Sequence, residues 1–116
     1  MEPTRVLAPD GARYRDLNRN GRLDPFEDPR LPAGRRAADL LGRLSLPEKV
    51  GLLFHTVIEA GADGSLLTGP GRIAKSATRE VVLDRYLNHF NVHELRDAAT
   101  AARWANTLQE LADRYG

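Results

Sequence analysis

Twelve consecutive residues place oxygen-bearing groups at the intervals that a calcium-binding loop requires. The expected ligands, in order along the loop, are Asp16, Asn18, Asn20, Arg22, Asp24 and Glu27. Arg22 would contribute only its backbone carbonyl, and Glu27 would contribute both carboxylate oxygens. Gly21 supplies the sharp turn because a residue without Cβ readily adopts positive φ. Calcium is a hard cation that prefers oxygen ligands, so the spacing predicts a metal site of the EF-hand type.

The same residues also allow an interpretation without metal. Asp24, Pro25 and Glu27 suit the N-cap, N1 and N3 positions of a helix start, with Glu27 reaching back to the N-cap amide. Several arginines around the loop reduce its negative potential and would weaken a calcium site. Pro29 restricts the long exiting helix of a calcium sensor, and the sequence contains no second such loop. A structural or calcium-bound surface turn is therefore favoured over a calcium-sensing switch.

The composition suits one small domain and excludes several function classes. The chain has 116 residues, of which 41% are apolar, and its 17 basic and 16 acidic residues leave a net charge of +1. This balance predicts no binding to nucleic acid or to a membrane surface. The absence of cysteine excludes disulfides, thiolate catalysis and cysteine-based zinc sites. No signal peptide or membrane span is expected, so the compartment stays open, with the cytoplasm as the default.

The order of elements predicts an α/β chain, mostly helical, with one or two short strands. Residues 1–32 hold five of the seven prolines and are expected to form a loop-like arm. Apolar residues at helical spacing predict two helices, and Ser45 to Glu48 reads as a capping box for the second. A third helix and a long C-terminal helix follow. The expected helices are 34–44, 46–54, 77–87 and 98–115, and the expected strands are 55–60 and 88–92.

The sequence from residue 61 onward contains a glycine-rich stretch, and the last helix has an N-cap residue and a tryptophan. The role of each is predicted from its position. The glycine-rich stretch 61–72 lacks the phosphate-binding pattern GxxxxGK[ST], so a mobile connecting loop is expected there. Asp97 suits the N-cap of the last helix, and Trp104 lies in the apolar stripe of that helix. Two short strands cannot form a stable sheet by themselves, which suggests that the chain is part of something larger.

The motif order resembles glycoside hydrolase family 3, the exo-acting glycosidases of β-glucosidase type. The resemblance covers nearly the whole chain and is weakest in the glycine-rich loop. Its most specific part joins the stripe of the first helix to the capping box of the second. The matching segments are Tyr14 to Gly21 with Asp28-Pro29, Arg36 to Leu41, Leu44 to Gly51, Asn88 to Val92, and Ala102 to Gln109.

This resemblance implies the opening segment of a (β/α)8 barrel, in which residues 1–32 form an N-terminal arm. Residues 33–116 would then hold the first helices, an early strand and the helix that follows it. The complete protein would be a retaining enzyme acting on a β-linked glucoside or a related oligosaccharide. Relatives of this kind are often exported. The partner of this segment would be the remainder of the glycosidase chain, and catalysis would need no cofactor beyond a possible structural Ca²⁺.

No position in this chain matches the catalytic pair of the family, so the chain alone is expected to be inactive. Glu94 follows the 88–92 strand at the end where barrel enzymes place their chemistry, but a solvated neighbour of the Asp97 cap is favoured. Glu59 and Asp63 flank the glycine-rich loop without a clear role. The three histidines lack metal-ligand spacing.

A rival hypothesis comes from another class of protein. The chain would then be a small calcium-dependent interaction module of the dockerin or EF-hand type. Dockerins carry two such loops, whereas this sequence carries one. A third hypothesis is a small complete binding domain that uses the glycine-rich loop. Sugar preference, linkage and oligomeric state are not specified by any of these patterns.

Overall fold

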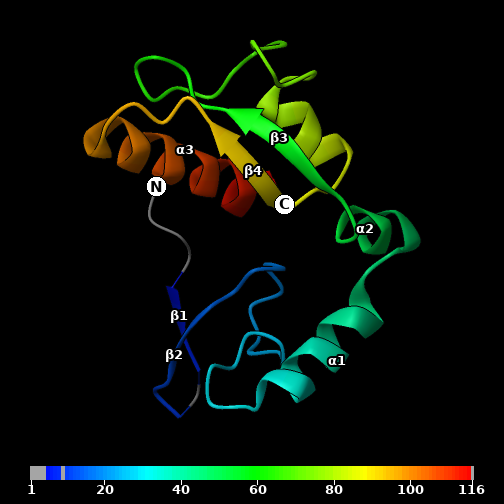
Figure 1. Cartoon of the computed structure of the whole chain (residues 1–116). Coiled ribbons are helices and arrows are strands. Elements are labelled where there is room, and N and C mark those ends of the chain that lie inside the picture. Colours follow the sequence, from blue (N-terminus) through cyan, green and yellow to red (C-terminus); the bar gives the residue numbers. More distant parts are fainter. Residues whose placement is uncertain (1–4, 9, 116) are drawn as a thin grey trace. The chain divides into compact units, whose positions relative to one another are not determined.

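The computed structural model describes residues 5–8 and 10–115, which form two compact units that divide between Ser45 and Leu46 (Figure 1). The model is a mixture of helices and short strands, so the expectation of an α/β chain is confirmed at that level. The first helix groups with the arm because Asp39 and Arg43 of this helix bond to the loop before it. The two compact units therefore divide after Ser45. The arm 1–32 and the barrel segment 33–116 stay a prediction.

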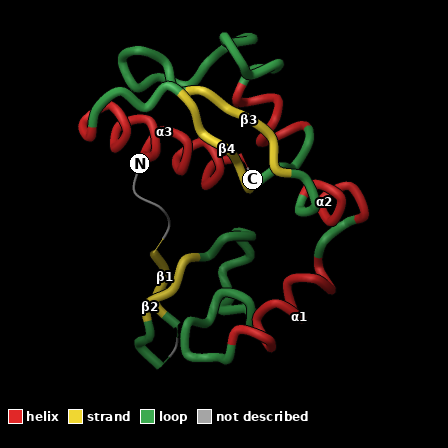
Figure 2. The backbone as a smooth tube through the Cα atoms, in the orientation of Figure 1, coloured by secondary structure: helices red, strands yellow, loops and turns green. Residues whose placement is uncertain are grey.

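A short hairpin opens the first unit. Strand β1 (Arg5–Leu7) pairs antiparallel with β2 (Arg13–Arg15), and Val6 is opposite Tyr14 (Figure 2). The sequence pattern predicts only loops here. Strands of three residues are too short to show a periodic pattern in the sequence. Backbone hydrogen bonds stabilise the hairpin, including one from Ala8 N–H to Ala12 O at 2.8 Å.

Helix α1 (Ala33–Arg43) confirms the helix predicted over 34–44 and ends the first unit. Its apolar stripe is not covered within the described residues: none of its residues is buried, and Leu41 is 54% exposed. A helix normally buries such a stripe, so this face lacks the packing that its pattern predicts.

The second unit begins with α2 (Leu46–Gly51), which is shorter than the predicted helix 46–54. Gly51 lies so close to the Tyr86 carbonyl that a Cβ at this position would overlap the backbone. The chain then turns and enters strand β3 (His55–Glu59). The side chains around α2 are strongly exposed, with Leu46 at 74%, Leu53 at 80% and Phe54 at 59%.

Strands β3 and β4 (His89–His93) form a two-stranded parallel sheet, in which His55 pairs with His89 and Glu59 with His93. Helix α3 (Ala98–Tyr115) packs against this sheet (Figure 1). The core is small and comprises Ile58, Ala60, Val81 and Trp104. Trp104 is 5% exposed, which confirms its predicted place in the core.

The helix predicted over 77–87 is present mainly as a π-helix, η1 (Glu80–Asp84). Its wider turn is visible in the bond from Arg85 N–H to Glu80 O at 3.2 Å, which spans five residues. Tyr86 follows with a left-handed φ of 57°. Helical spacing in the sequence does not distinguish this form from an α-helix.

The end of the second unit follows its sequence pattern closely. Asp97 caps α3: its Oδ1 accepts from Thr100 N at 2.8 Å, and its Oδ2 accepts from Thr100 Oγ1 at 2.9 Å. The backbone bond lowers the pKa of Asp97. Within residues 5–8 and 10–115, no helix is both long and apolar enough to cross a bilayer.

Candidate functional site

The loop that joins β2 to α1 curls around the carboxylate of Asp16. Oδ1 of Asp16 accepts from Asn20 N at 3.1 Å, and Oδ2 accepts from Gly21 N at 2.8 Å. Arg19 and Gly21 take left-handed φ values of 57° and 73°. The backbone therefore makes its sharp turn at the glycine, as the twelve-residue pattern predicted.

Asp24 lies where two asparagine side chains meet. Its Oδ2 accepts from Asn18 Nδ2 at 2.7 Å and from Asn20 Nδ2 at 2.5 Å, and its Oδ1 accepts from Arg43 Nη2 at 2.9 Å. The hydrogen bond from Asn18 is the main cause of a lowered pKa at Asp24, with further contributions from Asn20 and Arg43. The asparagine oxygens face the backbone, where they accept from Asn20 N and Arg22 N.

Glu27 closes the loop from inside. Its side chain is buried, with Oε1 accepting from Leu17 N at 2.7 Å and from Asn18 N at 3.4 Å. Oε2 accepts from Asp24 N at 3.1 Å, which is the reach-back contact of the metal-free interpretation. Residues 25–27 form a single turn rather than a helix, closed by Glu27 N–H to Asp24 O at 3.0 Å.

Helix α1 supplies loop contacts that the sequence does not predict, including a hydrogen bond from Arg36 Nε to Phe26 O at 3.0 Å. Asp39 Oδ2 accepts from Phe26 N at 3.1 Å, and it also pairs with Arg43 Nε at 2.9 Å. The Arg43 guanidinium lies 5.5 Å from the centroid of the Phe26 ring. The only available signal was the spacing of Asp39 and Arg43, which are four residues apart and hence neighbours on one helix face.

The loop therefore has the backbone path of a calcium loop, but its acidic oxygens are engaged by hydrogen-bond donors. Both oxygens of Glu27 accept backbone amides, and the asparagines turn their NH₂ groups, not their oxygens, toward Asp24. Arg22 is exposed, and its N–H donates to Asn20 Oδ1 at 2.8 Å. In the part of the chain that the structure describes, no three His, Asp or Glu side chains converge as a metal site. In this conformation the residues do not fit Ca²⁺.

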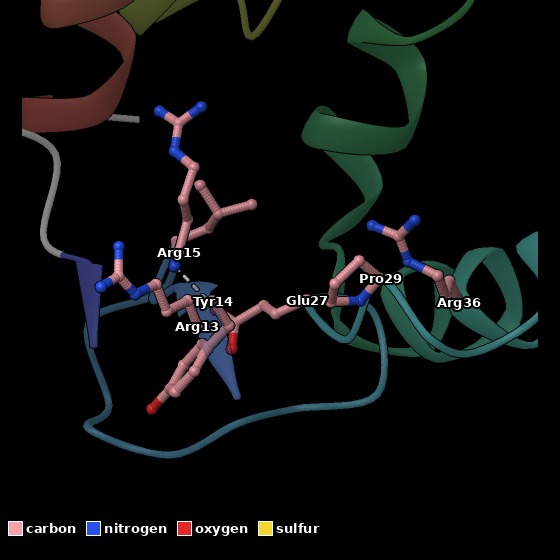
Figure 3. A pocket seen from close by; sticks show the side chains of 7 residues that line it. Arg13, Tyr14, Arg15, Glu27, Pro29 and Arg36 are labelled. Carbon is pink, nitrogen blue, oxygen red and sulfur yellow. Dashed lines mark hydrogen bonds between the residues drawn. The ribbon is translucent and has the colours of Figure 1, made fainter. Parts of the chain in front are cut away.

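A cavity of about 480 Å³ adjoins the loop (Figure 3). Its lining comprises Arg13, Tyr14, Arg15, Leu17, Glu27, Pro29 and Arg36. Burial is the main cause of a raised pKa at Tyr14, followed by the nearby charges of Asp16 and Glu27. Figure 3 shows the three guanidinium groups pointing in different directions, so they do not form a common anion site.

The carboxylates of the second unit fall into different environments. Asp63 accepts from Ser65 N at 3.0 Å, and its bonds to Ser65 lower its pKa. Glu94 pairs with Arg72 at 2.7 Å, whereas Glu59 is buried. The rings of His55 and His89 stack with centroids 5.2 Å apart.

The chain is similar in sequence to named glycosidases over almost its whole length. It is 38% identical over 109 residues to a periplasmic β-glucosidase/β-xylosidase of Dickeya chrysanthemi, covering 93% of this chain and 16% of that protein. It is 33% identical over 111 residues to a probable β-glucosidase C of Aspergillus oryzae, covering 94% of this chain and 17% of that protein. No protein-family model matches the chain.

The matches extend across both structural units, and the aligned relatives come from a bacterium and a fungus. The chain is thus a homologue of glycoside hydrolases. Within that class the homology is to the β-glucosidase type, which confirms the resemblance inferred from the motifs. The chain spans about one sixth of the length of these relatives.

Proposed function

We propose that this chain is the N-terminal portion of an exo-acting retaining β-glycosidase of family 3. Residues 1–32 would be the arm, and residues 33–116 the opening of a (β/α)8 barrel. The observation that carries the proposal is homology over 93% of this chain to a β-glucosidase/β-xylosidase of which it spans 16%. This homology covers far more than the twelve-residue loop, so it favours a glycosidase segment over a standalone calcium-dependent module.

The parallel sheet supports a larger barrel domain. Among the described residues, β3 and β4 pair in parallel only with each other. Parallel strands occur almost always in sheets covered on both faces, and isolated strand pairs are marginal in water. The outer edges of β3 and β4 are therefore suited to receive further strands of the same barrel.

Exposed apolar side chains support the same proposal. Leu46, Leu53 and Phe54 in the second unit are more than half exposed, although they belong to a helical apolar pattern. Full burial of such a side chain contributes about 1.5–3 kcal/mol of hydrophobic stabilisation, most of which is lost while the side chain stays in water. The remainder of a glycosidase chain is the natural cover for these groups.

The proposal places the catalytic carboxylates outside these residues. A retaining glycosidase needs a nucleophilic carboxylate and a second carboxyl group whose pKa is raised, so that it can donate a proton. Five aspartates have a lowered pKa, namely Asp10, Asp24, Asp28, Asp63 and Asp97. In Asp28, for example, hydrogen bonds from Arg30 lower the pKa to about 2. Such groups remain ionised and are suited to ion pairs, not to proton donation.

The proposal is tested by comparing the 116-residue polypeptide with the complete polypeptide encoded by the gene. Hydrolysis of an aryl β-glucoside and an aryl β-xyloside is measured for both. We expect activity only in the longer protein, with retention of anomeric configuration in the product. Hydrolysis by the short polypeptide, or none by the longer protein, would contradict the proposal.

We also propose that the Asp16–Glu27 loop can bind a structural Ca²⁺. The favourable observation is the backbone path, with Asp16 accepting two loop amides and Gly21 in the left-handed region. Binding requires the side-chain amides of Asn18 and Asn20 to turn their oxygens inward, and it requires Glu27 to release the backbone amides that its oxygens accept. Ca²⁺ would also replace Arg43 as the positive charge beside Asp24. Because of this competition, we expect a weak site with a Kd on the order of 1 mM.

At such a Kd, 10 mM Ca²⁺ stabilises the folded loop by about 1.4 kcal/mol, which corresponds to a Tm increase of at least about 6 °C. Thermal unfolding is followed by circular dichroism with Ca²⁺, with the chelator EDTA, and with Mg²⁺ as the ionic control. An identical Tm under all three conditions, together with no calcium in the purified protein, would exclude this site.

A further inference from the structure

The two faces of the β3–β4 sheet differ in character. Side chains alternate between faces along a strand, so Ile58 and Val92 share one face, while Glu59 and His93 share the other. The Ile58 face packs against α3 and η1 through Trp104 and Val81. The opposite face carries His55, Val57, Glu59, His89, Asn91 and His93. In a (β/α)8 barrel the helices lie outside, so this polar face would be turned inward.

Glu59 ends β3 and is the most deeply buried charged residue of the described chain, at 2% exposed. Its Oε1 accepts from Ile73 N at 2.6 Å. Its carboxylate also lies against the backbone of Gly71, where a Cβ would overlap it. Glu59 therefore fixes the segment Gly71–Ile73 against the carboxyl end of β3.

Arg72 lies in the middle of this fixed segment. Its Nη2 donates to Glu94 Oε1 at 2.7 Å, and the Arg72 side chain is 77% exposed. Glu94 directly follows β4 and adopts a left-handed φ of 65°. The backbone at Glu94 is thus held in an uncommon conformation at the carboxyl end of the second strand.

We propose that Arg72 and Glu94 form a specificity-determining pair that hydrogen-bonds sugar hydroxyl groups, with Glu59 as the positioning residue. This inference rests on the proposed function, because only the barrel assignment makes this strand end face a substrate. The carboxyl ends of barrel strands carry the substrate site. A guanidinium offers donors and a carboxylate offers acceptors, which suits the paired hydroxyl groups of a neutral sugar. The expected ligand is therefore the β-linked glycoside itself.

The experiment uses the complete polypeptide and measures kcat and KM for an aryl β-glucoside. Glu94→Gln changes a side chain that is 29% exposed and Arg72→Ala one that is 77% exposed. Each is expected to raise KM roughly tenfold with kcat changed less than about threefold. Glu59→Gln should raise KM in the same direction, and Glu59→Asp should restore it in part. Glu80→Gln is the matched control, since Glu80 forms a similar ion pair with Arg85 on η1. Its KM should equal that of the unmodified protein.

Two failures are distinguishable. If the unmodified complete protein hydrolyses the glycoside but Glu94→Gln and Arg72→Ala leave KM unchanged, the sugar-binding pair is refuted and the proposed function stands. If the unmodified protein neither hydrolyses nor binds the glycoside, the proposed function fails and this inference fails with it. Equal increases of KM in Glu94→Gln and Glu80→Gln would also refute the sugar-binding pair, because loss of an unrelated ion pair would then have the same effect.

Discussion

Replacing Trp104 with alanine is expected to destabilise the second unit by about 3–5 kcal/mol. Trp104 is 5% exposed and is the largest member of the core cluster with Ile58, Ala60 and Val81. A unit of this size has a total stability on the order of 5 kcal/mol, so between a few per cent and about half of the variant should be unfolded at 25 °C. The readout is urea unfolding followed by far-ultraviolet circular dichroism, because the variant lacks the only tryptophan.

Trp104→Phe is the informative control. Among the described residues the buried indole Nε1 has no hydrogen-bond partner, so phenylalanine removes a polar group that is already unsatisfied. The ring also keeps most of the packing with Ile58. We expect a loss below about 1.5 kcal/mol, well short of the alanine variant. If phenylalanine proves as damaging as alanine, the indole N–H must have an acceptor, and the account of a purely apolar role is wrong.

Elements with local signals could be predicted from the sequence. Helix α3 is an example: Asp97 caps it through Thr100, three residues away, and its apolar stripe places Trp104 in the core. Strand β4 is displaced by one residue from the predicted 88–92, because the end of a strand is set by its partner β3. The resemblance to β-glucosidases depended on such local motifs, and the comparisons confirm it.

Features that depend on distant partners could not be predicted. The β1–β2 hairpin is too short to show a period, and helical spacing does not distinguish the π-helical form of η1 from an α-helix. The Asp16–Glu27 loop likewise has local features that the sequence predicts and distant contacts that it does not. Its curl around Asp16 follows from residues within five positions, whereas the Asp24–Arg43 ion pair joins residues 19 positions apart. A pattern that considers only the twelve loop residues thus predicts a cation but not that Arg43 supplies the charge.

Replacing Glu27 with glutamine should open the Asp16–Glu27 loop even though the two side chains have the same shape. The carboxylate accepts three backbone amides, from Leu17, Asn18 and Asp24. Glutamine offers one oxygen, and its NH₂ group would face an amide donor in the second position. Hydrogen bonds to a charged acceptor contribute about 1.5–3 kcal/mol, so the loss of part of this set should destabilise the loop by about 2 kcal/mol or more.

The measurement is amide hydrogen exchange by NMR, which reports on each of these three donors separately. If the variant destabilises the closed loop by about 2 kcal/mol, the amides of Leu17 and Asp24 should exchange roughly thirtyfold faster. Glu110→Gln is the matched control, because Glu110 is exposed on α3, in the other unit. It should leave exchange in the loop unchanged. Unaltered protection at Leu17 and Asp24 in the Glu27 variant would show that the carboxylate charge does not hold the loop closed, and that the contacts of Asp39 and Arg43 suffice.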